Sequence, residues 1–299
     1  MSLKAGIVGL PNVGKSTLFN AITKKNILVA NYPFATIEPN VGIVTVPDER
    51  LGHLEEIYIP EELKPATFEF VDIAGIVKGA SLGEGLGNKF LSHIREVDAI
   101  VEVVRCFDDK EITHVDGSVD PIRDVEVINL ELALADLEII NNRIDKIKKK
   151  AETTKEKETV LEYNALTKAK EALEKDIPLR LVDFTKDEMF AIKGFNFLTL
   201  KPHIYLANIS ENEIKLENDY VKKLKEYAKG ENSKVIVVSA KIESELAELE
   251  DSDKEEMLNE LGIEKSGLDK LIEESYNLLG LKTYFTCGPK EVKAWTYKD

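Results

Sequence analysis

Residues 4–23 read KAGIVGLPNVGKSTLFNAIT, and this stretch decides the fold. Its middle part, GLPNVGKS at 9–16, matches the pattern G-x-x-x-x-G-K-[ST]. The apolar run KAGIVG before it predicts a buried strand, whereas Leu18, Phe19 and Ile22 after it have helical spacing. A phosphate-binding loop needs this strand–turn–helix context, because its glycines let backbone N–H groups turn inward toward phosphate oxygens.

The loop supplies charge and ligands as well as shape. Lys15 would place a cation at the β- and γ-phosphates of a nucleotide, and the Ser16 hydroxyl would ligate Mg²⁺. The helix that starts near Ser16 adds the positive end of its dipole. We therefore expect this turn to bind the phosphates through Asn12, Val13, Gly14, Lys15, Ser16 and Thr17.

Strands and helices alternate along the rest of the chain. Runs rich in β-branched and aromatic residues predict strands at 41–46, 67–73, 99–104, 203–208 and 234–239, and a helix is expected from about 89 to 96. This alternation predicts an α/β fold with a doubly wound, mostly parallel sheet. Residues 26–39 and the glycine-rich stretch 74–88 are expected to be loops, the second with a hinge at 79–87.

Two segments interrupt the alternation. Apolar residues recur at Leu130, Leu134, Leu137, Ile140, Ile144 and Ile147, and again at Tyr163, Leu166, Leu173 and Ile177 beyond a polar tip at 148–159. This spacing predicts an inserted antiparallel helical hairpin, although ordinary covering helices remain the alternative. Residues 281–299 have strand-like composition and are interpreted as the start of a further domain. The expected domains are thus 1–124 with 200–280, the hairpin 125–199, and 281–299.

Composition excludes several classes of protein. The net charge of −15 argues against coating bare nucleic acid through the overall field, although a local basic patch remains open. Cys106 and Cys287 are far apart in the sequence, so neither a disulfide framework nor a metal-ligand spacing is indicated. An apolar run of the about 20 residues that a membrane span requires is missing from the sequence. We expect a cytoplasmic protein with no membrane partner.

Further residues fit a site for phosphoryl chemistry. Asp72, at the end of a predicted strand, would hold Mg²⁺ through water, and Gly75 would bring its N–H to the γ-phosphate. Thr36, in the preceding loop, is the expected second hydroxyl ligand. Ile76 follows Gly75, and an alkyl side chain cannot orient a water, so we expect slow turnover. His114 lies in a polar loop just beyond a strand, which makes it a candidate catalytic residue.

The choice of base depends on residues 207–212, ANISEN. A guanine site carries Asn-Lys-x-Asp here, where the Asp carboxylate accepts from guanine N1–H and the 2-amino group. This chain has Ile209 in place of the Lys and Glu211, one methylene longer, in place of the Asp, while Asn208 keeps an amide able to pair with a base. Adenine lacks those two donors. Chemistry alone leaves ATP and GTP open.

Three blocks carry a family resemblance: GLPNVGKSTLFNAIT at 9–23, NYPFATIEPNVG at 31–42 and FVDIAGIVKGASLGEGLGNKFL at 70–91. Together they resemble the YchF family of Obg-like ATPases, within the translation-factor-related P-loop GTPases. The resemblance covers the chain and implies a nucleotide-binding domain, an inserted hairpin, and a C-terminal TGS domain (a ubiquitin-like β-grasp fold) of which 281–299 would be the beginning.

The resemblance also implies function. The motif NISE is similar to the Asn-x-x-Glu signature of the family, which favours ATP over GTP. Residues Ser239, Ala240 and Lys241 resemble the family's other base-side loop, and CFDDKEITHVDG at 106–117 resembles the segment with a His assigned to hydrolysis. The implied protein is an ATP-hydrolysing switch that associates with the ribosome or a ribosomal subunit, with Mg²⁺ and, as a second candidate cation, K⁺.

Two alternatives stay open. One is a conventional GTPase switch, and the other is an adaptor that binds ATP, presents its hairpin to a partner and barely hydrolyses the nucleotide. The basic tip at 148–150 is a candidate rRNA contact, but such a charge run is more often only solvated.

Overall fold

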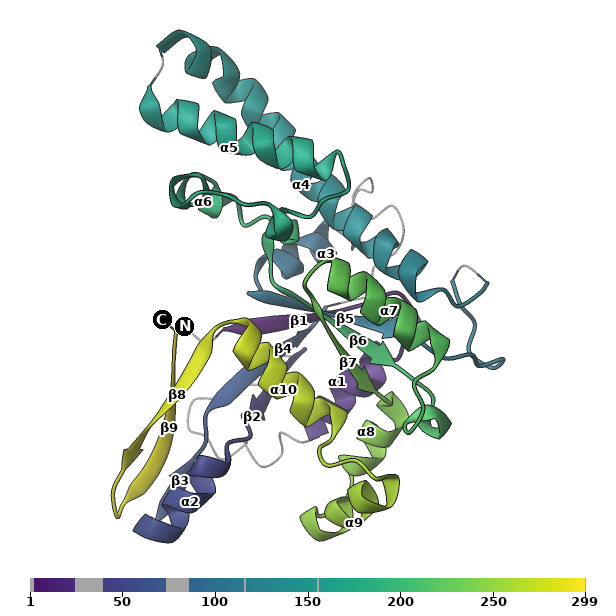
Figure 1. Ribbon diagram of the computed structural model, residues 1–299. Coiled ribbons are helices and arrows are strands. Elements are labelled where there is room, and N and C mark those ends of the chain that lie inside the picture. The colour runs from purple at the N-terminus through teal and green to yellow at the C-terminus, as the bar shows by residue number, and fades with distance from the viewer. Residues whose placement is uncertain (1–2, 25–39, 74–85, 116, 155, 299) are drawn as a thin grey trace. The chain divides into compact units, whose positions relative to one another are not determined.

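The computed structural model describes residues 3–24, 40–73, 86–115, 117–154 and 156–298 (Figure 1). The chain divides into two compact units. The first comprises Met1–Ala74, Val97–Ile122 and His203–Asp299, and the second comprises Gly75–Glu96 and Arg123–Pro202. Each unit is described by itself.

The first unit is built on a six-stranded sheet with the order β2-β4-β1-β5-β6-β7. Its strands are β1 (Lys4–Val8), β2 (Val41–Thr45), β4 (Thr67–Asp72), β5 (Ala99–Arg105), β6 (His203–Asn208) and β7 (Lys234–Val238). All neighbours pair in parallel except β2, which runs antiparallel to β4. The predicted α/β class with a mostly parallel sheet is confirmed, and the strand ends differ from the prediction by about one residue.

Helices cover both faces of this sheet. The helices of this unit are α1 (Lys15–Lys24), α2 (Glu49–Tyr58), α7 (Asp219–Gly230), α8 (Ala240–Leu246), α9 (Asp251–Leu261) and α10 (Gly267–Leu278), with a 3₁₀ turn, η5 (Glu211–Glu213), after β6. Of these, α2 packs against the C-terminal strands and α9 packs against α8. In Figure 1, α7 lies on one side of the sheet and α1, α8 and α10 lie on the other. The central strands β5 and β6 are accordingly buried at every residue, which explains their continuous apolar composition.

A small second sheet contains the C-terminal strands. The strands β8 (Leu281–Cys287) and β9 (Glu291–Lys298) form an antiparallel hairpin, and β3 (Glu62–Lys64) adds to β9 in parallel. An isolated strand pair is marginally stable at best. The third strand comes from residues next to α2, and neither β3 nor α2 was predicted from the sequence.

The second unit is helical. It contains α3 (Leu86–Arg95), α4 (Pro121–Thr154), α5 (Lys157–Leu173) and α6 (Lys186–Ile192), with short 3₁₀ turns η2 (Leu179–Leu181), η3 (Lys193–Phe195) and η4 (Leu198–Leu200). Figure 1 shows α4 and α5 as the predicted antiparallel pair. Because α3 begins at Leu86, the last residues of the expected glycine-rich loop are helical instead. The rest of that loop, and the expected loop at 26–39, lie outside the described residues.

The hairpin differs from its prediction in three places. Its tip is short, because α4 continues to Thr154 and α5 begins at Lys157, so 148–150 are helical. Leu130 is 49% exposed and Ile177, beyond the end of α5, is 41% exposed, so neither belongs to the core. Four of the predicted residues do build the seam, and three alanines that were not predicted join them: Ile140, Ile147, Leu166 and Leu173, with Ala165, Ala169 and Ala172. Small alanines let two helices approach closely, and a pattern search for large apolar residues overlooks them.

Candidate nucleotide site

The turn between β1 and α1 has the backbone shape of a phosphate cradle. Asn12 and Gly14 adopt positive φ angles of 62° and 93°, and α1 then begins with a bond from the Leu18 N–H to the Gly14 carbonyl of 3.0 Å. A Cβ atom at Gly14 would collide with the Asn208 side-chain amide and lie 3.4 Å from the Ala240 Cβ. Glycine is therefore required at this position both by its φ angle and by the space available.

The side chains predicted to bind phosphate lie at this turn. Ser16 and Thr17 are located at the N-terminus of α1, where backbone N–H groups have no partner inside the helix. The Lys15 ammonium forms an ion pair with the Asp72 carboxylate at the end of β4, and the two side chains are only 11% and 22% exposed. The structure thus brings together the predicted loop cation and the predicted Mg²⁺-binding carboxylate. Val13 is buried, so its side chain is not available to a phosphate.

The donors around this turn also fit a magnesium ion. Mg²⁺ prefers hard oxygen ligands and keeps several waters, so one hydroxyl and one carboxylate are a sufficient protein contribution. Ser16 and Asp72 offer such oxygens at the same edge of the sheet. Within the described residues no group of three or more His, Cys, Asp or Glu side chains is placed to hold a metal ion. Thr36 and Gly75, the other residues expected near the γ-phosphate, lie outside the described part of the chain.

Asn208 connects the phosphate turn to the base-side loop. Its Nδ2 donates to the Val13 carbonyl at 2.8 Å, and its Oδ1 accepts from the Ala240 N–H at 2.9 Å. The side chain is 3% exposed. Sequence reasoning expected this amide to pair with the base, whereas here it joins two walls of the site. One hydrogen of Nδ2 and one lone pair of Oδ1 are left for other partners.

Beside the turn lies a cavity of about 270 Å³. Every base-side residue predicted from the sequence contributes to its lining: Asn208, Ile209, Glu211, Ser239, Ala240 and Lys241. Ile209 is 2% exposed and its N–H donates to the Val238 carbonyl at 2.8 Å, so it offers the cavity little apolar surface. A space of this size, next to a phosphate cradle, suits a purine ring.

The carboxylate of Glu211 is engaged at the mouth of this cavity. It forms an ion pair with the Lys241 ammonium, whose side chain is 64% exposed. The hydrogen bond that the Lys241 ammonium donates to the Glu211 carboxylate raises the pKa of Lys241 above its ordinary value. The predicted Glu211 carboxylate is therefore present, but it is already paired with the Lys241 ammonium.

Sequence analysis missed one wall of the cavity. Phe107, Asp108, Asp109 and Ile112, in the loop after β5, line the side that faces the base-side residues. They lie within the segment 106–117, which the sequence analysis singled out for His114 and not for these four residues. The available signal was positional, because ligands in such sheets bind at the carboxyl ends of parallel strands, and this loop follows a central strand.

His114 belongs to the same loop but not to the lining of the cavity. It is 7% exposed, so it is not the solvated loop residue that such a position usually holds. Its neighbour Thr113 accepts a bond at its carbonyl from Asn12 Nδ2 of 3.1 Å. The loop that carries His114 is thus tied to the phosphate turn at one point.

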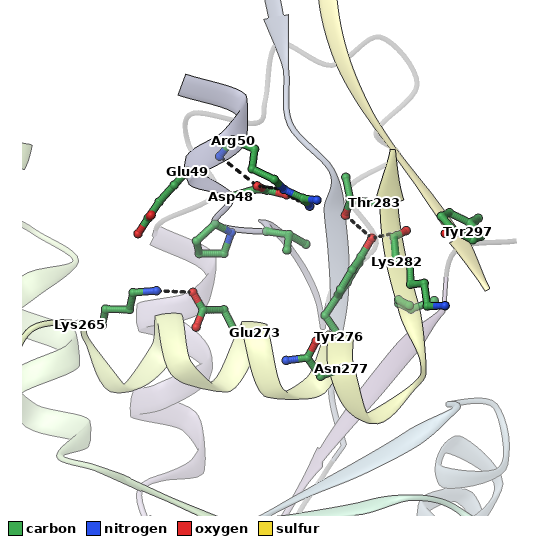
Figure 2. Close-up of a pocket in the computed structure, with 13 residues that line it drawn as sticks. Asp48, Glu49, Arg50, Lys265, Glu273, Tyr276, Asn277, Lys282, Thr283 and Tyr297 are labelled. Carbon is green, nitrogen blue, oxygen red and sulfur yellow. Dashed lines mark hydrogen bonds and ion pairs between the residues drawn. The ribbon is translucent and has the colours of Figure 1, made fainter. Parts of the chain in front are cut away.

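A larger cavity, of about 800 Å³, lies between α10, the start of α2 and the C-terminal hairpin (Figure 2). Four of its charged groups form two pairs: Arg50 donates to the Asp48 carboxylate at 2.8 and 2.6 Å, and Lys265 donates to Glu273 at 2.8 Å. The Tyr276 hydroxyl contacts the Lys282 carbonyl at 3.1 Å and Thr283 Oγ1 at 2.8 Å. Volume alone does not make a site here, because these polar groups already have partners.

Known proteins resemble this chain in sequence and in fold. Residues 4–164 match a family model described as a 50S ribosome-binding GTPase. Over 300 residues the chain is 60% identical to the Ribosome-binding ATPase YchF of Bacillus subtilis (strain 168), in a match that covers 100% of this chain and 82% of that protein. It is 52% identical over 296 residues to the protein of the same name from Escherichia coli O157:H7, covering 99% and 81%.

A solved structure agrees. The structure of the Schizosaccharomyces pombe YchF GTPase matches with a TM-score of 0.89 and 43% sequence identity, over 99% of this chain and 81% of that one. Among the described helices none is long and apolar enough to cross a membrane. Identity of this extent over the whole chain, together with the shared fold, shows that this chain belongs to the YchF family.

Proposed function

We propose that the chain binds ATP with Mg²⁺, hydrolyses it slowly, and acts as a nucleotide-dependent switch on the ribosome. Two of its relatives are named ribosome-binding ATPases, and the matching family model is described as ribosome-binding. The phosphate turn, the Lys15–Asp72 pair and the adjoining cavity support nucleotide binding in this chain.

The preference for ATP rests on one observation, the ion pair between Glu211 and Lys241. Guanine needs a carboxylate to accept from its N1–H and 2-amino group, and a site built for those donors rejects a base that lacks them. In this chain the carboxylate is already neutralised by Lys241. Adenine has no donor at either place, so it loses nothing by this pairing, whereas guanine would leave a donor without a partner.

Hydrolysis would proceed by attack of a water on the γ-phosphorus, with release of ADP and inorganic phosphate. Lys15 would stabilise the charge that develops on the β- and γ-phosphate oxygens, and Gly75 would donate its N–H to the γ-phosphate. Mg²⁺, held by Ser16, Thr36 and Asp72, would neutralise further charge. His114 is the candidate to orient the water, because Ile76 cannot.

Slow intrinsic turnover follows from that arrangement. His114 is buried beside the site and does not line the cavity, so a rearrangement must bring it to the phosphate end. If His114→Ala retained full ribosome-stimulated activity, this role would be wrong. K⁺ is the second candidate cation, and its effect is measured by comparing turnover in potassium and sodium salts.

A comparative titration tests the proposal. Calorimetric titration of Mg–ATP and Mg–GTP into the protein should give the lower dissociation constant for ATP. Tighter binding of GTP would overturn the choice of base and favour the conventional GTPase, since the matching family model and the fission yeast relative are both called GTPases. Turnover that stays negligible with ribosomes and K⁺ would instead indicate the adaptor.

A further inference from the structure

Arg105 is a buried arginine that no sequence motif identifies. It is the last residue of β5, at the carboxyl edge of the sheet, and it is only 1% exposed. Burying a guanidinium is costly unless hydrogen bonds replace its lost water. Its partners therefore show what keeps it there.

Three backbone carbonyls accept from this guanidinium. Nε donates to Phe107 at 3.1 Å, Nη1 to Ile112 at 3.0 Å and Nη2 to Asp109 at 3.2 Å. The Cζ atom also lies 4.8 Å from the centre of the Phe107 ring. All three carbonyls belong to a single loop, and each of the three residues lines the cavity beside the phosphate turn.

Two further hydrogen bonds also hold this loop in place. Asn218 Nδ2 donates to the Cys106 carbonyl at 2.7 Å, and the Tyr220 hydroxyl donates to Asp108 Oδ2 at 2.9 Å. These bonds fix the outer side of the loop, whereas Arg105 holds its inward carbonyls. A planar guanidinium with several donors in fixed directions can satisfy three carbonyls at once, which a lysine ammonium cannot do in the same geometry.

We propose that Arg105 is a positioning residue for nucleotide recognition: it holds the Phe107–Ile112 loop as the wall against which the base packs. Arg105 itself does not touch the nucleotide. Its effect should fall on binding of the base rather than of the phosphates, because the bond that ties this loop to the phosphate turn, from Asn12 Nδ2 to the Thr113 carbonyl, does not involve the three carbonyls that Arg105 holds. The inference rests on the proposed function, since it takes the cavity to be the base pocket.

The test distinguishes an effect on binding of the base from an effect on binding of the phosphates, by using a ligand that has no base. Arg105→Lys should raise the KM for ATP about ten-fold, as expected for the loss of about two hydrogen bonds, with kcat within about two-fold of the parent value. The inhibition constant of Mg–tripolyphosphate against ATP hydrolysis should stay unchanged. Tyr220→Phe, which removes a different tie to the same loop, should shift the KM in the same direction by a smaller factor.

Arg95→Lys is the matched control. Arg95 also donates to a backbone carbonyl, that of Asn196 at 3.2 Å, but in the helical unit. The Arg95→Lys variant should have the same KM for ATP and the same inhibition constant for tripolyphosphate as the parent protein. Thermal melting followed by circular dichroism checks that each variant is folded. If Arg105→Lys does not fold, the KM of Tyr220→Phe decides the inference.

Three results would overturn the inference: equal weakening of ATP and tripolyphosphate, a fall in kcat with unchanged KM, or parental constants in a folded Arg105→Lys variant. The proposed function fails separately. If the parent protein prefers GTP, the choice of ATP is wrong, and the same comparison with GTP against tripolyphosphate still decides the role of Arg105.

Discussion

At the scale of single residues, Asn208 determines whether the two walls of the nucleotide site stay together. Asn208→Ala would leave the Val13 carbonyl and the Ala240 N–H buried without their partner. We expect a loss of about 2–3 kcal/mol in the free energy of unfolding, and weaker binding of both nucleotides. Urea unfolding and calorimetry measure the two effects. Asn259→Ala, at an exposed position on α9, is the control, and equal stability of the two variants would refute the prediction.

The second prediction at this scale concerns Lys241. Lys241→Met would release the Glu211 carboxylate to accept from guanine. Because exposed ion pairs are weak, the ratio of GTP to ATP affinity should rise by only about three- to ten-fold. The double variant with Glu211→Gln should lose that gain. An unchanged ratio in Lys241→Met would mean that the ion pair plays no part in base selection.

At the scale of elements, helix α2 depends on the residue that caps its start. The Asp48 side chain accepts from the Arg50 N–H at 3.1 Å and also pairs with the Arg50 guanidinium. The hydrogen bond with the Arg50 side chain lowers the pKa of Asp48 below its usual 3.8. The stability that the carboxylate contributes is therefore present above pH 3.8 and is lost as pH falls through the lowered pKa.

The corresponding variant is Asp48→Ala, which should lose about 1 kcal/mol at pH 7. The difference from the parent should shrink as the solution is acidified below pH 3.8. Urea midpoints measured from about pH 7 down to about pH 2.5 test both expectations. Glu55→Ala, exposed on the same helix, is the control. A difference that stays constant over this range would exclude the charge of Asp48 as its source.

In the helical unit, Asp136 fixes the chain that returns from the hairpin. It is fully buried and accepts from the Leu198 N–H at 3.0 Å, the Thr199 N–H at 2.8 Å and the Thr199 hydroxyl at 2.8 Å. Asp136→Ala should speed hydrogen exchange at these two amides and cost about 3 kcal/mol. Glu138→Ala, exposed on the same helix, should change neither. Unaltered exchange at Leu198 and Thr199 would contradict the role of Asp136.

At the scale of the whole molecule, charge opposes contact with a ribosome. The net charge of −15 repels rRNA phosphates, so any rRNA contact has to use a local basic surface such as 148–150, which is exposed near the end of α4. If rRNA is bound there, a triple variant should co-sediment less with ribosomes, and its binding should depend less on salt. The variant combines Lys148→Gln, Lys149→Gln and Lys150→Gln. The same change at Lys222, Lys223 and Lys225 on α7 is the control. Equal effects would exclude a specific role for the tip.

Much of this molecule was predictable from sequence because its signals are local. A strand, a glycine turn and a helix within residues 4–23 indicated the sheet, and the alternation that follows indicated its class. What escaped prediction depends on distant partners. Arg105 looks like an ordinary charged residue until the Phe107–Ile112 loop folds over it, and β3 is too short to recognise before β9 pairs with it. Asn208, Val13 and Ala240 were all predicted as site residues, but the hydrogen bonds that join them were not.

The pairing of β3 with β9 has a consequence for biosynthesis. Glu62 lies opposite Glu291 in that ladder, so more than two hundred residues are translated after β3 before its partner is made. Until then the edge of β3 is open while the polypeptide is still emerging from the exit tunnel. Contacts this remote along the chain form late, and an unpaired edge invites intermolecular association in the meantime. Nascent chains stalled before residue 291 should therefore recruit chaperones more strongly than released ones.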